Sequence, residues 1–258
     1  MDDDDADTSP GAGGHLGILA HSTEGAALCF LAFCQQGHRE LGPGQHPDVT
    51  LDYIAFGYSM AAWEAGDHAA VRGTLAVSAA RLAAAGAEFF ACPDNTAHLA
   101  LERPGPELAL PGLHIAAEVA DQAARDGRRR VGILGTRFLA ASTLYPRALA
   151  ARGVAAEIPG PADCAAVDEI IFAELVNGVF TAAARAACGA VIARLAEHGC
   201  DAVALACTEL PALLSPADSP LPALDSTRLL ARAAYQVARG ARPRPAWRGG
   251  PFPPPPPG

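Results

Sequence analysis

The sequence lacks the patterns of a membrane, secreted or disulfide-bonded protein. None of its apolar runs reaches the roughly 20 residues that a membrane-spanning helix needs. No basic stretch precedes the first apolar segment, near residue 26, as a signal peptide would require. The seven cysteines are odd in number and include no CxxC pair, which argues against a disulfide framework and a zinc site. We therefore expect a cytoplasmic protein that holds no metal.

Signals for nucleic-acid and nucleotide binding are also missing. The formal net charge is −9, part of which comes from four aspartates at residues 2–5, and no basic stripe offsets it. Neither a GxGxxG pattern nor a Walker motif occurs. These absences predict no nucleic-acid partner, no membrane partner and no nucleotide cofactor.

What the sequence does contain is an alternation of strand-like and helix-like segments. The chain has 258 residues, half of them hydrophobic, which is enough to bury a substantial core. Buried-type runs alternate with amphipathic stretches, a pattern typical of parallel sheets with right-handed crossovers. We predict strands near residues 15–20, 49–56, 87–93, 113–115, 131–134 and 201–205, and helices near residues 23–33, 69–85, 116–126, 165–175 and 229–238.

Two polar junctions follow two of these strands. Asp94 and Asn95 follow the strand near residue 90, and Cys207 and Thr208 follow the strand near residue 203. The first amides of a helix have no partner within it, so polar groups placed there sit among free N–H donors. Such a position lowers a cysteine's pKa from about 8.5 toward neutrality, which makes Cys207 a candidate base. The repeated junction predicts an α/β protein with two similar lobes, each a parallel sheet flanked by helices, and the active site in the cleft between them.

The predicted division of the chain follows from these segments. We expect a disordered acidic tail at residues 1–14, a first lobe at 15–115 that residues 225–240 rejoin, a second lobe at 116–224, and an extended, unpacked proline-rich tail at 241–258.

Several spaced motifs together resemble a known family. They are Gly-Ile-Leu at residues 17–19, Asn-Thr-Ala-His at 95–98, Gly-Ile-Leu-Gly-Thr at 132–136, Cys-Thr-Glu-Leu-Pro at 207–211 and Asp-Ser-Thr at 225–227. Their order resembles that of the aspartate/glutamate (and hydantoin) racemase superfamily. The resemblance covers roughly residues 15–238, and the segment from residue 172 to residue 209 resembles the branch that acts on acidic amino acids.

The resemblance implies an amino-acid racemase or epimerase that works without pyridoxal phosphate. Two groups on opposite faces of the substrate would remove and return a proton at the α-carbon. It further implies a small-molecule substrate, an acidic amino acid such as aspartate or glutamate, and a homodimer. The implied catalytic pair is Asp94 and Cys207, and the implied substrate-binding residues are Ser22, Tyr58, Ser59, Asn95, Thr96, Thr136 and Thr208.

Asp94 departs from the family pattern. A cysteine usually stands immediately before the Asn-Thr-Ala-His motif; here Asp94 does, and Cys92, two residues earlier, fits a small core residue better. The ordinary pKa values of a carboxylate and a thiol, about 3.9 and 8.5, differ by more than four units. The two directions of turnover are then inequivalent unless the site raises the pKa of Asp94, and we expect burial and a neighbouring thiolate to raise it.

Other functions stay open at this stage. Cys207 alone would serve a decarboxylase of arylmalonates, although an ionised Asp94 would repel the departing carboxylate. Cis–trans isomerisation of a small diacid and a non-catalytic ligand-binding protein are further alternatives. Three residues also allow two interpretations: Ser22 suits a helix N-cap or a substrate contact, His98 a local structural bond or a catalytic group, and Glu209 a helix start or the cleft wall.

Overall fold

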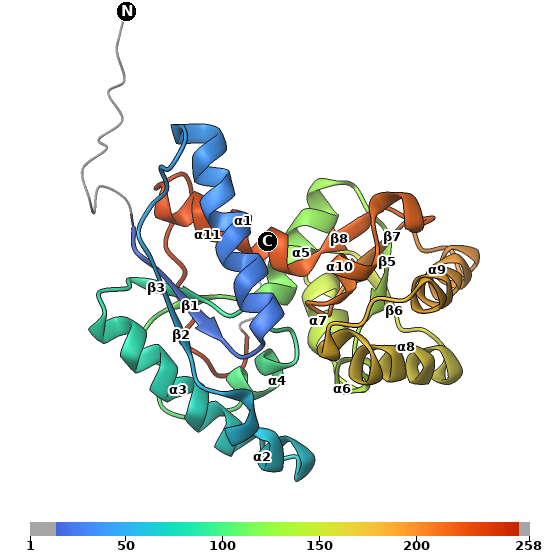
Figure 1. The fold of residues 1–258 in the computed structure, drawn as a ribbon, viewed down its shortest axis with the longest axis horizontal. Coiled ribbons are helices and arrows are strands. Elements are labelled where there is room, and N and C mark those ends of the chain that lie inside the picture. Colours follow the sequence, from blue (N-terminus) through green and yellow to red (C-terminus); the bar gives the residue numbers. More distant parts are fainter. Residues whose placement is uncertain (1–13, 253–258) are drawn as a thin grey trace, which may run out of the picture.

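The computed structural model describes residues 14–252, which form two lobes side by side (Figure 1). Each lobe contains a four-stranded, all-parallel sheet flanked by helices, which confirms the predicted fold class. The predicted acidic tail lies outside the described residues except for Gly14.

The first lobe is built on a sheet with the strand order β2-β1-β3-β4. Its central strand β1 is buried along its whole length. The strands are β1 (Leu16–Ala20), β2 (Val49–Tyr53), β3 (Phe89–Ala91) and β4 (Gly112–Leu113). The helices are α1 (Thr23–Leu41), α2 (Met60–Glu64), α3 (His68–Ala84) and α4 (Ala97–Leu101), with a 3-10 turn, η1 (Phe56–Tyr58).

The second lobe repeats this arrangement with the order β6-β5-β7-β8. Its strands are β5 (Arg130–Leu134), β6 (Ala155–Glu157), β7 (Ala202–Leu205) and β8 (Ala223–Asp225). Its helices are α6 (Arg137–Ala140), α7 (Leu144–Ala150), α8 (Pro161–Ala173), α9 (Ala182–Glu197) and α10 (Leu210–Leu213), with 3-10 turns η2 (Leu175–Asn177) and η3 (Pro216–Asp218). Because β3 and β7 hold the same place in their sheets, the segments that follow them are structurally equivalent.

Two helices join the lobes. After β4, α5 (Ile115–Arg125) leads into the second lobe, and after β8 the chain returns as α11 (Ser226–Ala238) to pack on α1. The contact is apolar: the rings of Phe33 and Tyr235 lie 6.0 Å apart in a T-shaped arrangement within one core cluster. We therefore propose that residues 225–240 belong to the first lobe, as predicted from the sequence.

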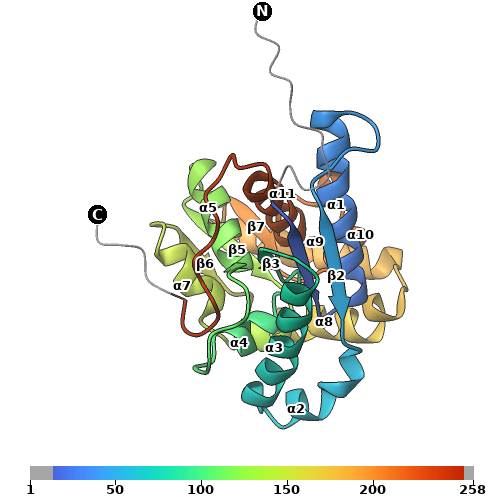
Figure 2. The same cartoon turned by 90° about the vertical axis from the view of Figure 1, so that its left-hand side faces the viewer.

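Residues 241–252 correct one prediction, because this segment is not unpacked. It runs along the first lobe (dark red in Figure 2), and its Trp247 is only 8% exposed. The carbonyl of Trp247 accepts a 2.7 Å bond from the amide of Gly112, and its indole stacks on His98. The buried ring of Trp247 and the hydrogen bond to β4 hold this segment against the lobe, although its prolines favour an unpacked chain.

Candidate active site

The two polar junctions meet between the lobes beside the start of α1. Ser22 caps this helix by accepting a 3.2 Å bond from the amide of Gly25. A Cβ atom at Gly25 would lie 2.3 Å from the carbonyl oxygen of Pro93 and 2.5 Å from Cγ2 of Thr208. Glycine is thus required where α1 packs against the loop after β3 and the loop after β7. This packing brings the segments of Asp94 and Cys207 to one place.

Asp94 is held as a carboxylate. Its Oδ2 lies 2.7 Å from Nδ1 of His21, and its Oδ1 accepts a 3.1 Å bond from the amide of Ala97. Burial opposes ionisation, but the bonds from His21 and Ala97 outweigh it, so the pKa of Asp94 lies below its ordinary value. This corrects our expectation of a raised pKa, because the sequence does not show that His21, a residue outside the motif, bonds to the charged form of Asp94.

His21 and Trp63 were not predicted as site residues. His21 follows β1 and is 3% exposed, and its Nε2 accepts a 3.3 Å bond from the indole N–H of Trp63 on α2. The ring of Phe56 meets the imidazole edge-on at 5.0 Å. The position of His21 at the end of a buried strand was visible in the sequence, but nothing there pairs it with Trp63.

Cys207 is held as a thiol. Its Sγ donates a 2.8 Å bond to Oε2 of Glu209, and its side chain is buried. Burial, the carboxylate of Glu209 and their hydrogen bond raise the pKa of Cys207 well above its ordinary value, which is the reverse of the predicted lowering. The helix that follows, α10, has four residues and begins only at Leu210, so its dipole has little influence at the thiol.

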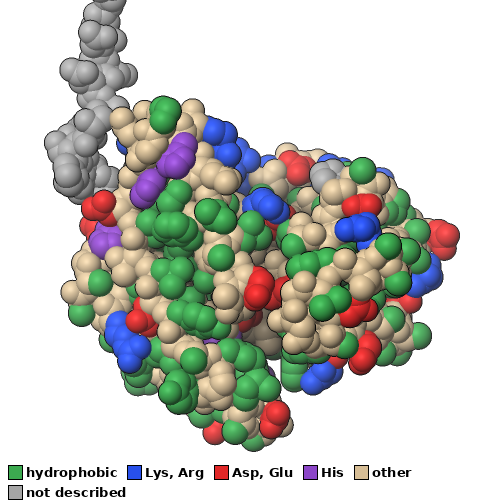
Figure 3. All heavy atoms as spheres, viewed as in Figure 1, with side chains coloured by type: hydrophobic (Ala, Val, Ile, Leu, Met, Phe, Trp, Pro, Cys, Tyr) green, Lys and Arg blue, Asp and Glu red, His purple; other side chains and the backbone are tan. Residues whose placement is uncertain are grey.

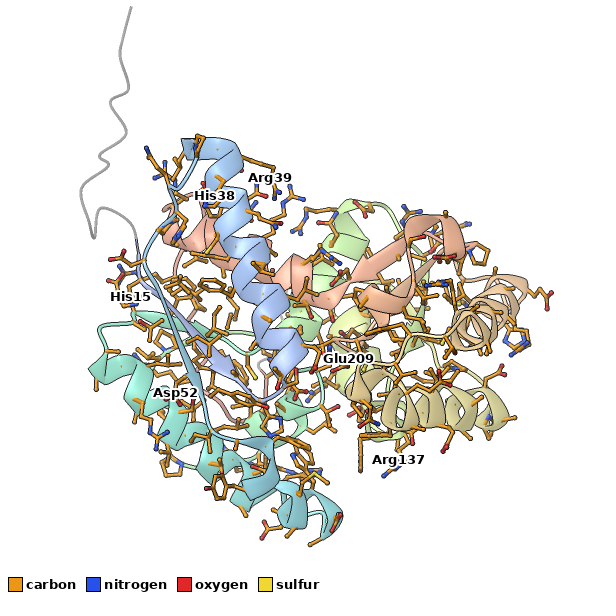
Figure 4. The ribbon with its side chains drawn as sticks, in the orientation of Figure 1. His15, His38, Arg39, Asp52, Arg137 and Glu209 are labelled. Atoms are coloured by element: carbon orange, nitrogen blue, oxygen red, sulfur yellow. The ribbon has the colours of Figure 1, made fainter. Side chains whose placement is uncertain are left out.

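Glu209 stands at the start of α10 and is buried beside Cys207. Its carboxylate is 5% exposed and lies at the junction of the two lobes (Figure 4). Burial and the charge of Asp94 raise its pKa, although bonds from Cys207 and Thr208 act in the opposite direction. The two carboxylates therefore differ in character, since Asp94 favours the ionised form and Glu209 is shifted toward the protonated form.

Hydroxyl pairs connect the two lobes on either side of this centre. Ser22 Oγ lies 3.4 Å from Thr208 Oγ1, and Thr96 Oγ1 lies 3.3 Å from Thr136 Oγ1. Each pair joins residues that the resemblance assigns to substrate binding. The hydroxyls thus provide hydrogen-bonding groups that both lobes share.

The side chain of Asn95 makes two hydrogen bonds to protein groups. Its Oδ1 accepts a 2.6 Å bond from the hydroxyl of Tyr145, and its Nδ2 donates over 3.0 Å to Ser226 Oγ. Ser226 in turn donates to the carbonyl of Leu205 at the end of β7. This buried chain ties the junction after β3 to the second lobe. A role for Asn95 in substrate binding stays a prediction.

His98 has a structural role. Its Nδ1 lies 2.9 Å from the carbonyl oxygen of Asp94, and its Nε2 accepts a 3.2 Å bond from the amide of Ile115. Burial and the neighbouring His114 lower the pKa of His98 to about 3, so the ring is neutral and its Nδ1–H donates. Of the two interpretations, the structural bond holds.

Tyr58 and Ser59 lie apart from this network. The side chain of Tyr58 is 82% exposed, and Ser59 is buried at the start of α2 without a hydrogen bond to the other predicted site residues within residues 14–252. Cys92 is fully buried in an apolar cluster, and burial raises its pKa well above the ordinary value, consistent with a core residue. In the described part of the chain, no group of three or more His, Cys, Asp or Glu side chains is arranged to hold a metal, and no helix is long and apolar enough to cross a membrane.

The comparisons with known proteins agree with this geometry. A family model described as Asp/Glu/Hydantoin racemase matches residues 26–234. The broad-specificity amino-acid racemase RacX of Bacillus subtilis (strain 168) is 28% identical over 166 residues, which span 64% of this chain and 71% of RacX.

Solved structures are similar over most of the chain. A protein of Yersinia pestis assigned to the Asp/Glu racemases superposes with a TM-score of 0.76 at 28% identity, covering 87% of this chain and 99% of that one. The aspartate racemase of Picrophilus torridus shares the fold, with a TM-score of 0.73 at 23% identity over 88% and 94% of the two chains. The chain belongs to the Asp/Glu/hydantoin racemase family, and it is an isomerase that acts on small molecules without pyridoxal phosphate.

Proposed function

We propose that this protein racemises or epimerises an amino acid with Asp94 and Cys207 as its two proton-transfer groups. The observation that carries the proposal is their opposite protonation at equivalent positions after β3 and β7. Asp94 is a carboxylate bonded by His21 and Ala97, whereas Cys207 is a thiol bonded to Glu209. One group is thus ready to accept a proton and the other to donate one.

The proton balance of one turnover follows from these states. A carboxylate oxygen of Asp94 takes the α-proton, and the electron pair left behind spreads into the substrate carboxylate as an enediolate-like charge. In this proposal hydroxyls such as that of Thr208, which lies 3.4 Å from the hydroxyl of Ser22, stabilise this charge. Cys207 Sγ then gives its proton to the other face of the α-carbon, which leaves Asp94 protonated and Cys207 as a thiolate. The reverse turnover, or proton exchange with solvent, restores the first state.

The composition is consistent with chemistry that needs no pyridoxal phosphate. All 19 basic residues of the Lys/Arg class are arginines, and the chain has no lysine. It therefore offers no side-chain amine for the Schiff base through which pyridoxal phosphate enzymes hold their cofactor.

The proposed substrate is an acidic amino acid, aspartate or glutamate. Support comes from the acidic-branch resemblance of residues 172–209 and from the similarity to the Yersinia pestis protein assigned to the Asp/Glu racemases. The name of RacX denotes a broader range, so the assay should also include neutral and basic amino acids. An ionised Asp94 disfavours the arylmalonate decarboxylase alternative, because the leaving carboxylate would meet a like charge.

The test is chiral chromatography of each amino acid incubated with the enzyme, starting separately from the L- and the D-form. Racemisation that is lost in both Asp94→Asn and Cys207→Ser supports the proposal. Racemisation that survives either change excludes the two-base assignment. Conversion of maleate or a malonate, with no racemisation, would instead establish one of the alternatives.

We also propose that the protein forms a homodimer. β2 is an edge strand, and apolar side chains are exposed along it and on α1, where Figure 3 shows a hydrophobic band. They include Leu31 (52% exposed) and Leu51 (42% exposed). Light scattering coupled to size-exclusion chromatography measures the mass directly, and a monomer at all concentrations would refute this proposal.

A further inference from the structure

The surroundings of His21 define which of its nitrogens carries a proton. Tryptophan's indole nitrogen is a hydrogen-bond donor only, and Trp63 Nε1 points its hydrogen at Nε2 of His21 over 3.3 Å. Nε2 must therefore be unprotonated. The neutral ring then carries its hydrogen on Nδ1, which lies 2.7 Å from Asp94 Oδ2. His21 is a donor to Asp94, not an acceptor.

We propose that Trp63 and His21 are positioning residues for Asp94: the indole N–H fixes the Nδ1–H tautomer of His21, which holds the Asp94 carboxylate in orientation and keeps the imidazole from taking the substrate's proton. This inference rests on the proposed role of Asp94 as a base. It concerns two residues that the motif Asn-Thr-Ala-His does not include.

The geometry makes His21 a fixed donor instead of a proton relay. Both ring nitrogens are already used, Nδ1 as a donor and Nε2 as an acceptor. A second proton on Nε2 would face the indole hydrogen of Trp63 and break this hydrogen bond. The proton that Asp94 removes from the substrate thus stays on Asp94. A carboxylate oxygen has two acceptor sites, and the recorded bonds to Oδ1 and Oδ2 use one site each.

Other titratable groups lie on both sides of this pair. Phe56 covers one edge of the His21 ring, and His68 lies against Trp63 with its pKa lowered by burial. On the side of Asp94 lie the neutral His98, the thiols of Cys92 and Cys207, and Glu209. The imidazole of His21 is therefore the neutral side-chain donor to Asp94, and the indole of Trp63 fixes the orientation of this imidazole.

The first experiment determines the tautomer by long-range 1H–15N NMR of the histidine rings in the intact protein. We expect His21 to show a protonated Nδ1 and a bare Nε2 at neutral pH. An Nε2–H tautomer, or an imidazolium, overturns the inference. This result needs no substrate, so it is independent of whether the proposed function holds.

The second experiment removes each hydrogen bond and follows activity against pH. His21→Leu should lower kcat/KM about 10- to 100-fold, the usual effect of losing a bond to a charged group. His21→Asn should recover most of this loss, because its amide keeps a donor near the position of Nδ1 and does not titrate. Equal activity of the two variants would contradict the proposal.

Trp63→Phe keeps an aromatic ring and removes only the indole N–H. Nε2 of His21 is then free to bind a proton in mild acid, and the resulting imidazolium would weaken Asp94 as a base. We expect kcat/KM of this variant to fall about tenfold between about pH 8 and about pH 5.5, where an ordinary imidazole is about nine-tenths protonated. Wild-type kcat/KM should show no such step.

Trp247→Phe is the matched control. Trp247 is also buried in the first lobe, and its indole donates to the carbonyl of Gly250 instead of to His21. Its loss should affect stability and leave the form of the pH profile unchanged. A profile of Trp63→Phe that coincides with those of the wild type and this control overturns the inference.

Discussion

Asp94→Asn should abolish racemisation while leaving a folded protein. An amide cannot remove the α-proton, and general bases contribute about 10²- to 10⁴-fold to rate, so kcat should fall by at least this range. Both oxygens of Asp94 now accept N–H bonds, from His21 and Ala97. Asparagine has one oxygen and one NH2, so either orientation sets a donor against a donor, at a cost of about 1–3 kcal/mol in the free energy of unfolding.

The pH dependence of this loss of stability shows whether it comes from the Asp94 carboxylate. The pKa of Asp94 is lowered in the folded state, so its contribution to stability is present above the unfolded pKa of about 3.9 and disappears as pH falls through the folded pKa. The difference between wild type and Asp94→Asn in urea unfolding should therefore shrink in acid. A difference that stays constant down to about pH 2, which lies below the ordinary carboxylate range, would refute this account of the site.

Asp201→Asn is the control for this substitution. Asp201 precedes β7, at the opposite end of that strand from Cys207, and its carboxylate also accepts backbone amides, at 2.9 Å from Arg129 and 3.2 Å from Arg130. It should cost stability without loss of racemisation. If Asp94→Asn keeps kcat within about tenfold of wild type, well short of a lost general base, the base is another group.

Three further changes test the remaining parts of the site. Cys207→Ser keeps a donor for Glu209 but is a far weaker acid, so racemisation measured by chiral chromatography should fall about 10²- to 10⁴-fold; a smaller loss would remove Cys207 from the chemistry. Glu209→Gln imitates the protonated side chain. Because the pKa of Glu209 is raised in the folded state, the stability that it contributes below about pH 4.3 is lost as pH rises through the folded pKa. In urea unfolding the variant should therefore become more stable relative to wild type between about pH 4 and about pH 8, and a stability difference that does not change with pH would contradict this. Tyr145→Phe leaves Asn95 Oδ1 without its 2.6 Å donor and should cost about 1–3 kcal/mol by the same measurement, whereas an unchanged midpoint would show that water replaces the hydroxyl.

The parts of the fold that carry strong periodic patterns could be predicted from the sequence. Buried strands such as β1 and β7 and long helices such as α3 appear near their predicted positions, because apolar runs and amphipathic periods extend over enough residues to be recognised. The short strands β6 and β8, of three residues each, were not predicted, because their pairing with β5 and β7 is what makes them strands. The burial of Trp247 could not be predicted for the same reason, because it depends on contacts with β4 and His98, which are distant in sequence.

The sequence showed that Asp94 and Cys207 follow equivalent strands, but it did not show the electrostatics of this pair. Both pKa directions were predicted wrongly. Each depends on a side chain whose orientation the sequence does not show: His21 comes to Asp94 from the end of β1, and Glu209 turns back to the Cys207 thiol. Burial and a specific partner therefore decide the protonation of this pair more strongly than the position at a helix start does.

The most direct test of the account is proton NMR of L- and D-aspartate and of L- and D-glutamate with the enzyme in D2O, following the α-proton and chirality together. Two-base chemistry predicts that deuterium appears in the newly formed enantiomer while the remaining substrate keeps its α-proton, because Asp94 removes a proton on one face and Cys207 delivers a deuteron on the other. Deuterium entering the unconverted substrate as fast as the product, or racemisation that persists in Asp94→Asn, would contradict the assignment of Asp94 and Cys207 as the catalytic pair.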